Sequence, residues 1–304
     1  MAAARRHRCS SFTRHPKLRQ LALGGATSLA LAFAAVGPTA AAEGAGTSVV
    51  RAWYAAKFER FDLRAAEALQ STSFRDHSGV VSGDGAPADR RELLQVIVEG
   101  DYVAAFSHSG RPEKDEVGHM DLFRLTQDGK IAEHWGLSER QPPPNALLHS
   151  NGWITKPSPI DPAAIGNEAA NTGVVMSFFN DVLAKGDMKK SSDVQADQYV
   201  QHATGVKTGN AGLREWAAQT NMAANPWQVQ VFKTVAQGNY VFMYGRGSGL
   251  GSPILLALTD WFRVENGKLQ EHWGFVGPIT ESAAPSQVDR FENLKPLNGP
   301  CPLC

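Results

Sequence analysis

The chain of 304 residues contains an internal repeat, and this repeat constrains the fold more than any other feature. Four motifs occur twice, in the same order and with nearly the same spacing. The first set is Phe74-Arg-Asp-His77, Gly100-Asp-Tyr-Val103, Asp121-Leu-Phe-Arg124 and Glu133-His-Trp-Gly136, and the second set is Tyr199-Val-Gln-His202, Gly238-Asn-Tyr-Val241, Asp260-Trp-Phe-Arg263 and Glu271-His-Trp-Gly274. Chance is a poor explanation for this agreement, so the sequence predicts two copies of one small domain.

Each copy begins with an apolar helical pattern and continues into strands joined by Gly-containing turns, which is typical of an α+β domain. The clearest helix has an apolar stripe from Val174 to Leu183 and is expected to end near Gly186. The expected organisation is a signal peptide at 1–42, a shortened first domain at 43–140, a Pro-rich linker at 141–166, a second domain at 167–278 and a tail at 279–304.

The first 42 residues contain six Lys and Arg and no Asp or Glu. An apolar run at 21–36 follows the basic residues, and Ala40, Ala41 and Ala42 follow the run, which is the pattern of a cleaved signal peptide. The run has about 16 residues, fewer than the ~20 that a membrane-spanning helix needs. We therefore expect a secreted or periplasmic protein without a stable membrane anchor after cleavage.

Cleavage would leave 24 Lys and Arg against 30 Asp and Glu, a net charge of about −6 that disfavours nucleic acid as a partner. The tail contains Cys301 and Cys304 in a C-x-x-C spacing, which we interpret as a local disulfide, with a redox or metal role as the alternative. The histidines are scattered, and no nucleotide-binding or metalloprotease motif is present. No metal and no cofactor are expected.

In the second copy, alternate residues from Ile254 to Val264 are apolar except for Asp260, so this carboxylate is expected on an apolar sheet face. Asn266-Gly267 predicts a two-residue hairpin turn. A regular register after that turn would place Phe262 opposite Glu271 and Asp260 opposite Trp273. In the first copy, the same reasoning places Phe123 opposite Glu133 and Asp121 opposite Trp135, and it sends His272 and His134 to the other face.

A carboxylate on an apolar face loses hydration and holds a proton more readily, which suits it to proton transfer. Asp260 and Asp121 are therefore acid/base candidates, and the alternative for both is a structural carboxylate. His202 and His77 end a passage from helix to strand, where they either line a pocket or cap a turn. The predicted catalytic set is Asp260, His202, Asp121 and His77, and the predicted pocket lining is Trp273, Glu271, Tyr240, Tyr244, Arg246, Phe262, His108 and Trp135.

These motifs resemble those of the SnoaL-like branch of the NTF2-like superfamily, over nearly all of both copies. The resemblance implies two tandem cone-shaped α+β barrels, each with a curved antiparallel sheet packed on helices around a pocket. It also implies that the first domain packs on the second as a pseudo-dimer. The founding members of the family are polyketide cyclases that use an Asp on a late strand, where Asp260 and its counterpart Asp121 stand. A histidine on the preceding strand assists in those enzymes, and its nearest matches here are His108 and, as a departure, Arg246.

The resulting hypothesis is an exported protein that binds a small, mostly apolar carbonyl compound, with Asp260 as the acid/base of an aldol, isomerase or dehydratase reaction. One alternative is a ligand-binding or interaction module of the cell envelope that catalyses nothing. A weaker alternative is epoxide hydrolysis, which would require an Asp-Arg-Asp set in the pocket.

Overall fold

The protein is described by a computed structural model in which residues 40–78, 90–111, 114–279 and 290–298 can be placed. The predicted signal sequence up to residue 39 and both tail cysteines lie outside these described residues. The described residues belong to one compact unit that spans 37–304. None of their helices is both long and apolar enough to cross a membrane.

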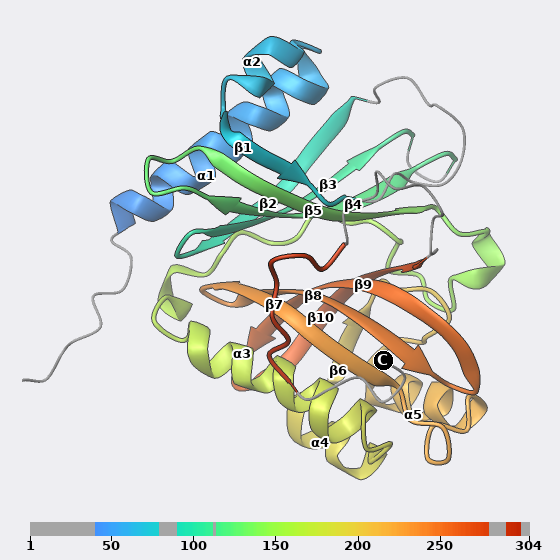
Figure 1. Cartoon of the computed structure of the whole chain (residues 1–304). Coiled ribbons are helices and arrows are strands. Elements are labelled where there is room, and N and C mark those ends of the chain that lie inside the picture. The colour runs from blue at the N-terminus through green and yellow to red at the C-terminus, as the bar shows by residue number, and fades with distance from the viewer. Residues whose placement is uncertain (1–39, 79–89, 112–113, 280–289, 299–304) are drawn as a thin grey trace, which may run out of the picture. The chain divides into compact units, whose positions relative to one another are not determined.

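The first half forms a five-stranded sheet with helices on one face (Figure 1). Its elements are α1 (Ala40–Tyr54), the π-helical turn η1 (Ala55–Glu59), α2 (Leu63–Glu67), β1 (Gln70–Asp76), β2 (Arg91–Glu99), β3 (Tyr102–Ser109), β4 (Val117–Leu125) and β5 (Ile131–Arg140). The strand order is β1-β5-β4-β3-β2, with β1 parallel to β5 and the other neighbours antiparallel. The sheet is therefore mixed and not wholly antiparallel as expected.

The second half repeats this strand order as β6-β10-β9-β8-β7, again with a parallel first pair. Its elements are α3 (Glu168–Ser177), the π-helical turn η4 (Phe178–Leu183), α4 (Ser191–Val194), β6 (Gln195–Gln201), α5 (Gly209–Gln219), β7 (Gln228–Gln237), β8 (Tyr240–Gly249), β9 (Ser252–Glu265) and β10 (Lys268–Pro278). The predicted helix end is confirmed, because η4 ends at Leu183 and Gly186 has a φ of +62°. Three short 3-10 turns, η2 (Pro144–Ala146), η3 (Pro162–Ala164) and η5 (Met188–Lys190), complete the described elements.

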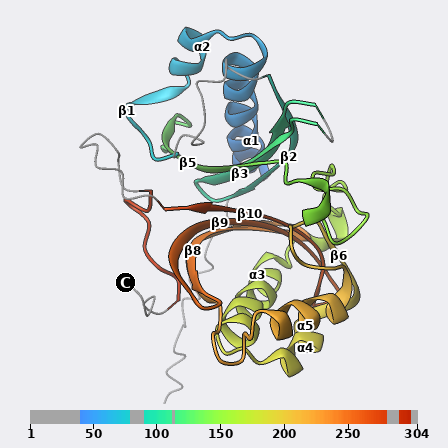
Figure 2. The same ribbon diagram turned by 90° about the vertical axis from the view of Figure 1, so that its right-hand side faces the viewer.

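Side chains alternate along each strand, so the two faces of each sheet pack into different cores. Figure 2 shows α3, α4 and α5 along the concave side of the second sheet, where they cover Met243, Leu258 and Phe262. The opposite face carries Tyr240, Phe242, Tyr244, Trp261 and Trp273, which share one buried core with Phe106, Met120, Leu122 and Trp135 of the first sheet. Buried aromatic side chains from both halves thus stabilise the same core.

The hairpin between β9 and β10 differs from the predicted register. The two-residue turn is confirmed, since Asn266 and Gly267 have φ values of +52° and +70°. The pairing then shifts by one residue between Leu269 and Glu271, so His272, and not Glu271, lies opposite Phe262. Such a β-bulge reverses the face of every residue that follows it.

The same shift occurs between β4 and β5, and the predicted pairs there are wrong for the same reason. Phe123 pairs with His134, and Asp121 pairs with Gly136. The predictions that Asp260 faces Trp273 and that His272 and His134 point away from the carboxylates are therefore wrong. Each histidine lies on the face of its Asp.

Candidate functional site

Asp260 in β9 and His272 in β10 form a hydrogen-bonded pair on the helix-covered face of the second sheet. His272 Nε2 lies 2.7 Å from Asp260 Oδ1. The side chain of His272 is 11% exposed and that of Asp260 is 15% exposed, so both are shielded from bulk water but remain accessible. The hydrogen bond to His272 uses Oδ1; none to Oδ2 is found among the described residues, and Asp260 lines the cavity described below.

Gln201 fixes the tautomer of His272. Its side-chain oxygen accepts hydrogen bonds from the backbone N–H groups of His202 (3.0 Å) and Ala203 (2.9 Å), so this atom is the amide oxygen. His272 Nδ1 lies 2.9 Å from the same oxygen and must donate to it. The ring therefore presents Nε2 to Asp260.

Aromatic side chains and a glycine hold this geometry. The His272 ring stacks on Phe262 with centroids 4.6 Å apart, and Tyr199 is stacked at 6.3 Å. A Cβ on Gly274 would lie 2.8 Å from the His272 ring and 3.0 Å from Asp260 Oδ1. The glycine that closes each repeat motif is thus required by the close approach of histidine and carboxylate, since Gly136 lies in the same way against Asp121.

A cavity of about 360 Å³ opens over the pair. It is bounded by the sheet, by the helices α5 and η4, and by the loop after β6. Most of its lining is apolar, and it contains no Lys or Arg; the lining residues are Glu139, Phe178, Phe179, Leu183, Tyr199, Gln201, Ala203, Thr204, Val206, Leu213, Trp216, Trp227, Gly249, Leu250, Ser252, Leu256, Leu258, Asp260, His272, Gly274 and Val276. A small apolar molecule with one polar group fits this chemistry.

Two residues predicted to line the pocket, Glu271 and Trp273, lie elsewhere, because the bulge in β10 turns them to the other face of the sheet. His202 stacks on Trp273 at 4.6 Å, and its Nε2 lies 3.0 Å from Glu271 Oε1. Arg263 also binds Glu271, which helps to hold the pKa of Glu271 below its ordinary value despite burial. This group is a structural cluster behind the sheet, and none of its residues is among those that line the cavity at Asp260.

The remaining predicted residues of β8 and β9 are also outside the cavity lining. Tyr240 and Tyr244 belong to the core shared with the first sheet. Arg246 donates to the side chain of Gln230 on β7. Phe262 lies on the correct face, where it supports His272 from behind.

In the first half, Asp121 is enclosed by hydrogen-bond donors. His134 Nε2 lies 2.8 Å from Oδ1, the Tyr54 hydroxyl donates to Oδ2, and Arg91 lies 3.5 Å from Oδ2. Asp121 is 3% exposed. Burial favours its neutral form, but His134 and Arg91 outweigh burial and hold the pKa of Asp121 at about 2. Both of its oxygens are occupied, so it has no free position for a ligand.

Asp76 stands where the second half has Gln201, and it lies 3.1 Å from Nδ1 of His134. Burial opposes the charged form of His134, yet Asp76 and Asp121 together raise its pKa. His134 therefore lies between two carboxylates that favour its charged form. Of the other predicted residues, His77 stacks on Trp135 at 5.0 Å and binds Glu133 at 2.9 Å, and His108 Nδ1 lies 2.7 Å from Glu116. These contacts are structural pairings within the first half.

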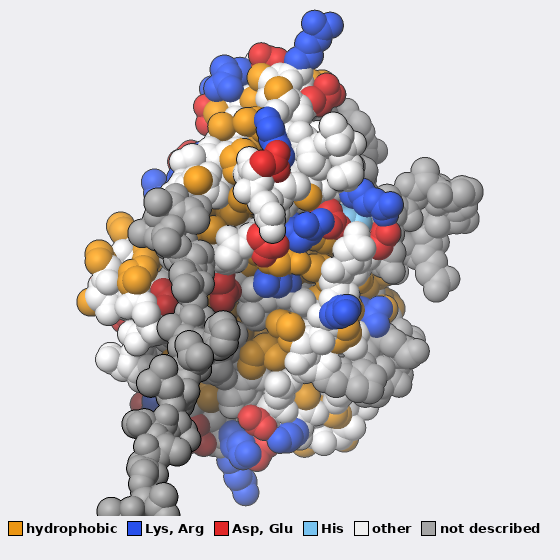
Figure 3. All heavy atoms as spheres, turned by 60° about the vertical axis from the view of Figure 1, so that its left-hand side comes forward, with side chains coloured by type: hydrophobic (Ala, Val, Ile, Leu, Met, Phe, Trp, Pro, Cys, Tyr) orange, Lys and Arg blue, Asp and Glu red, His pale blue; other side chains and the backbone are white. Residues whose placement is uncertain are grey.

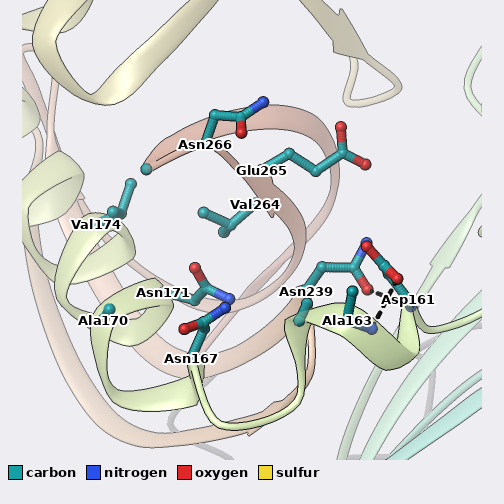
Figure 4. A pocket seen from close by; sticks show the side chains of 12 residues that line it. Asp161, Ala163, Asn167, Ala170, Asn171, Val174, Asn239, Val264, Glu265 and Asn266 are labelled. Atoms are coloured by element: carbon teal, nitrogen blue, oxygen red, sulfur yellow. Dashed lines mark hydrogen bonds between the residues drawn. The ribbon is translucent and has the colours of Figure 1, made fainter.

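A second, polar cavity of about 630 Å³ lies at the start of α3 (Figure 4). Its asparagines hold neighbouring segments together: Asn171 donates to the Gly238 carbonyl, and Asn239 accepts from the Asp161 backbone N–H. No histidine lines this cavity. We interpret it as the joint between the linker and the second sheet.

Sequence reasoning missed His272, Gln201 and Glu139 as site residues. The repeated Glu-His-Trp-Gly motif drew attention to His272. No residue pattern marks a β-bulge, however, so the sequence did not show on which face of the sheet His272 lies. In the sequence, Gln201 could be noticed only as the residue that occupies the position of Asp76 in the second copy of the repeat. Glu139 comes from the other sheet, a placement that follows only from the packing of the two halves.

Among the described residues, no cluster of three or more His, Cys, Asp or Glu side chains could hold a metal ion. Acidic and basic side chains are interspersed with hydrophobic ones on the face shown in Figure 3.

Comparison with known proteins identifies a family for part of the chain. A putative polyketide cyclase from Acidithiobacillus ferrooxidans is 18% identical, with 35% of this chain and 87% of that one aligned and a TM-score of 0.31. IdmH, a putative polyketide cyclase from Streptomyces antibioticus, is also 18% identical, with 35% of this chain and 91% of that one aligned and a TM-score of 0.30. An LEH-like epoxide hydrolase from M. tuberculosis is 16% identical, with 36% of this chain and 85% of that one aligned and a TM-score of 0.32. No curated protein matched the sequence. The family model for the SnoaL-like domain matches residues 175–272, so this part of the chain is a SnoaL-like domain.

Proposed function

We propose that the second half binds a small, mostly apolar carbonyl compound and that Asp260 moves a proton next to that carbonyl. The observation that carries this proposal is the Asp260–His272 pair, 2.7 Å apart, at the base of an apolar cavity of about 360 Å³. A SnoaL-like domain at 175–272 agrees with a small-molecule site. The reaction class is an aldol, isomerase or dehydratase reaction without a cofactor.

The chemistry follows from the hydrogen bonds. Asp260 Oδ2 accepts the proton from the carbon next to the carbonyl, while the His272 ring, fixed by Gln201, stabilises the carboxylate through Nε2. Burial and the nearby Asp260 raise the pKa of Tyr199 well above its ordinary value, so its hydroxyl stays protonated. Tyr199 lines the cavity, and we assign its hydroxyl, which also lies beside Gln195 and Gln201, as the donor to the carbonyl oxygen.

The two halves have unequal roles in this proposal. Asp121 has both oxygens occupied by Tyr54, His134 and Arg91, whereas Asp260 keeps one oxygen free. We assign catalysis to the second half and a structural role to the first, as in a fused pair of SnoaL-like domains. We also propose export by the N-terminal segment 1–42, which the sequence pattern favours.

The first experiment is native mass spectrometry of the chain purified from its own host, which asks whether a small molecule is bound. The second measures hydrogen–deuterium exchange next to the carbonyl of the bound compound, or of apolar ketones, in D₂O. Asp260→Asn should slow this exchange by at least about 100-fold without loss of folding. Asp193→Asn is the control, because Asp193 is exposed on α4.

Three results discriminate between the candidate functions. Unchanged exchange in Asp260→Asn would remove this residue from the mechanism. A ligand that binds both the wild-type protein and the variant without exchange or product would favour a binding module of the cell envelope. Epoxide hydrolysis is disfavoured, because no Arg is found among the described residues that line the cavity with Asp260.

A further inference from the structure

Glu139 brings a second carboxyl group into the cavity that contains Asp260 and His272. Glu139 lies near the end of β5 in the first sheet and lines this cavity. Its Oε2 accepts a hydrogen bond of 2.8 Å from the backbone N–H of Val276 in β10, which lines the same cavity. The first sheet therefore supplies one ionisable group to a cavity that is otherwise built by the second half.

This carboxyl group has no cationic partner among the described residues. Its one hydrogen bond is to the Val276 N–H, and no Lys or Arg lines the cavity. Burial raises the pKa of Glu139 to about 7, against the smaller opposing effect of the Val276 N–H. A shielded carboxyl group without a counter-charge gains free energy from a hydrogen-bond donor on a ligand.

The position of Glu139 also sets the length of a ligand that could reach both Glu139 and the Asp260–His272 pair. Glu139 binds β10 at Val276, four residues beyond His272. At about 3.3 Å per residue, the Cα atoms of His272 and Val276 lie about 13 Å apart along β10. Trp216, Trp227 and Leu256 line the cavity that contains both groups, so the body of the ligand should be apolar.

We propose that Glu139 is a specificity residue, which accepts a hydrogen bond from a hydroxyl or ammonium group at the far end of an elongated apolar ligand whose carbonyl lies at Asp260. This inference rests on the proposed function of the same cavity. It also excludes anionic ligands, because Glu139 and Asp260 are both acids and no lining side chain carries a fixed positive charge.

The test uses four 2-acetylnaphthalenes that carry hydrogen, hydroxymethyl, aminomethyl or carboxylate at position 6, titrated into the full chain by calorimetry. In the wild-type protein, the hydroxymethyl and aminomethyl ketones should bind about 10-fold more tightly than the unsubstituted ketone, and the carboxylate at least about 10-fold more weakly. Glu139→Gln should remove the advantage of the aminomethyl ketone but keep most of the hydroxymethyl advantage, since glutamine still offers an acceptor. Glu67→Gln, at an exposed residue of α2, is the matched control.

Two kinds of failure are distinguishable. If the four ketones bind the wild-type protein equally, or if Glu139→Gln keeps the wild-type order of affinities, the role of Glu139 is refuted while the carbonyl site stands. If no ketone binds the folded wild-type protein, the proposed function fails, and the inference that rests on it fails too. Glutamine preserves the acceptor for the Val276 N–H, so this variant is expected to fold.

Discussion

The residue behind the histidine differs between the two acid–histidine pairs. In the first half, Asp76 lies behind His134, so this histidine is placed between two carboxylates. In the second half, the neutral amide of Gln201 lies behind His272. The second carboxylate in the first half favours the charged form of His134, whereas Gln201 offers His272 a neutral acceptor.

Gly274 gives a prediction at the scale of one residue. Gly274→Ala would place a Cβ 2.8 Å from the His272 ring and 3.0 Å from Asp260 Oδ1, so the pair must separate. We expect the rate of α-carbon exchange with an apolar ketone to fall by about 10-fold or more, because a displaced base loses its alignment. Gly173→Ala is the control, since a Cβ there meets no atom within 4 Å. Equal rates for wild type and Gly274→Ala would show that the close approach is unnecessary.

At the scale of one element, the bulge in β10 decides which chemistry each face carries. The extra residue at Gln270 brings His272 to the face of Asp260 and places Glu271 and Trp273 on the opposite face, where Trp273 joins the shared core. Without it, the glutamate would enter the apolar helix-side core and the tryptophan would fill the cavity. The strand therefore encodes the site through its register as much as through its residues.

Deletion of Gln270 tests this argument. The deletion should destabilise the protein severely, because a regular register buries Glu271 without Arg263 and His202 as partners. Gln270→Ala keeps the bulge and should change the free energy of unfolding by less than about 1 kcal/mol. Chemical denaturation followed by circular dichroism measures both variants. A deletion variant as stable as the wild type would mean that the register is set elsewhere.

The elements that the sequence predicted well are those with local signals. Residues with a preference for positive φ specify the Asn266-Gly267 turn and the helix end before Gly186. Alternation of apolar residues along the strand specifies the row around Asp260. The bulge at Gln270 depends on how the strand fits its neighbours and has no residue preference of comparable strength. For that reason the Asp was placed on the correct face and the histidine on the wrong one. The contribution of Glu139 depends on contacts between residues far apart in the sequence.

At the scale of the whole molecule, the halves share buried polar contacts as well as a core. Trp261 Nε1 donates to Gln95 Oε1 at 2.8 Å across the core, and Gln95 Nε2 donates to the Ser158 carbonyl of the linker at 2.9 Å. Gln95 therefore joins the first sheet, the linker and the second sheet. A buried donor that loses its partner costs about 1–3 kcal/mol.

Gln95→Leu should lower the free energy of unfolding by about 1–3 kcal/mol, because Trp261 Nε1 would be left buried without an acceptor. Gln198→Leu, at an exposed position of β6, controls for the change in residue type. Denaturation of both variants should be followed by tryptophan fluorescence and by far-ultraviolet circular dichroism. If the halves fold as one unit, the two signals coincide and shift together in Gln95→Leu. Two separate transitions, with only one displaced, would contradict the fused pair and would leave Glu139 without a fixed place in the cavity of the second half.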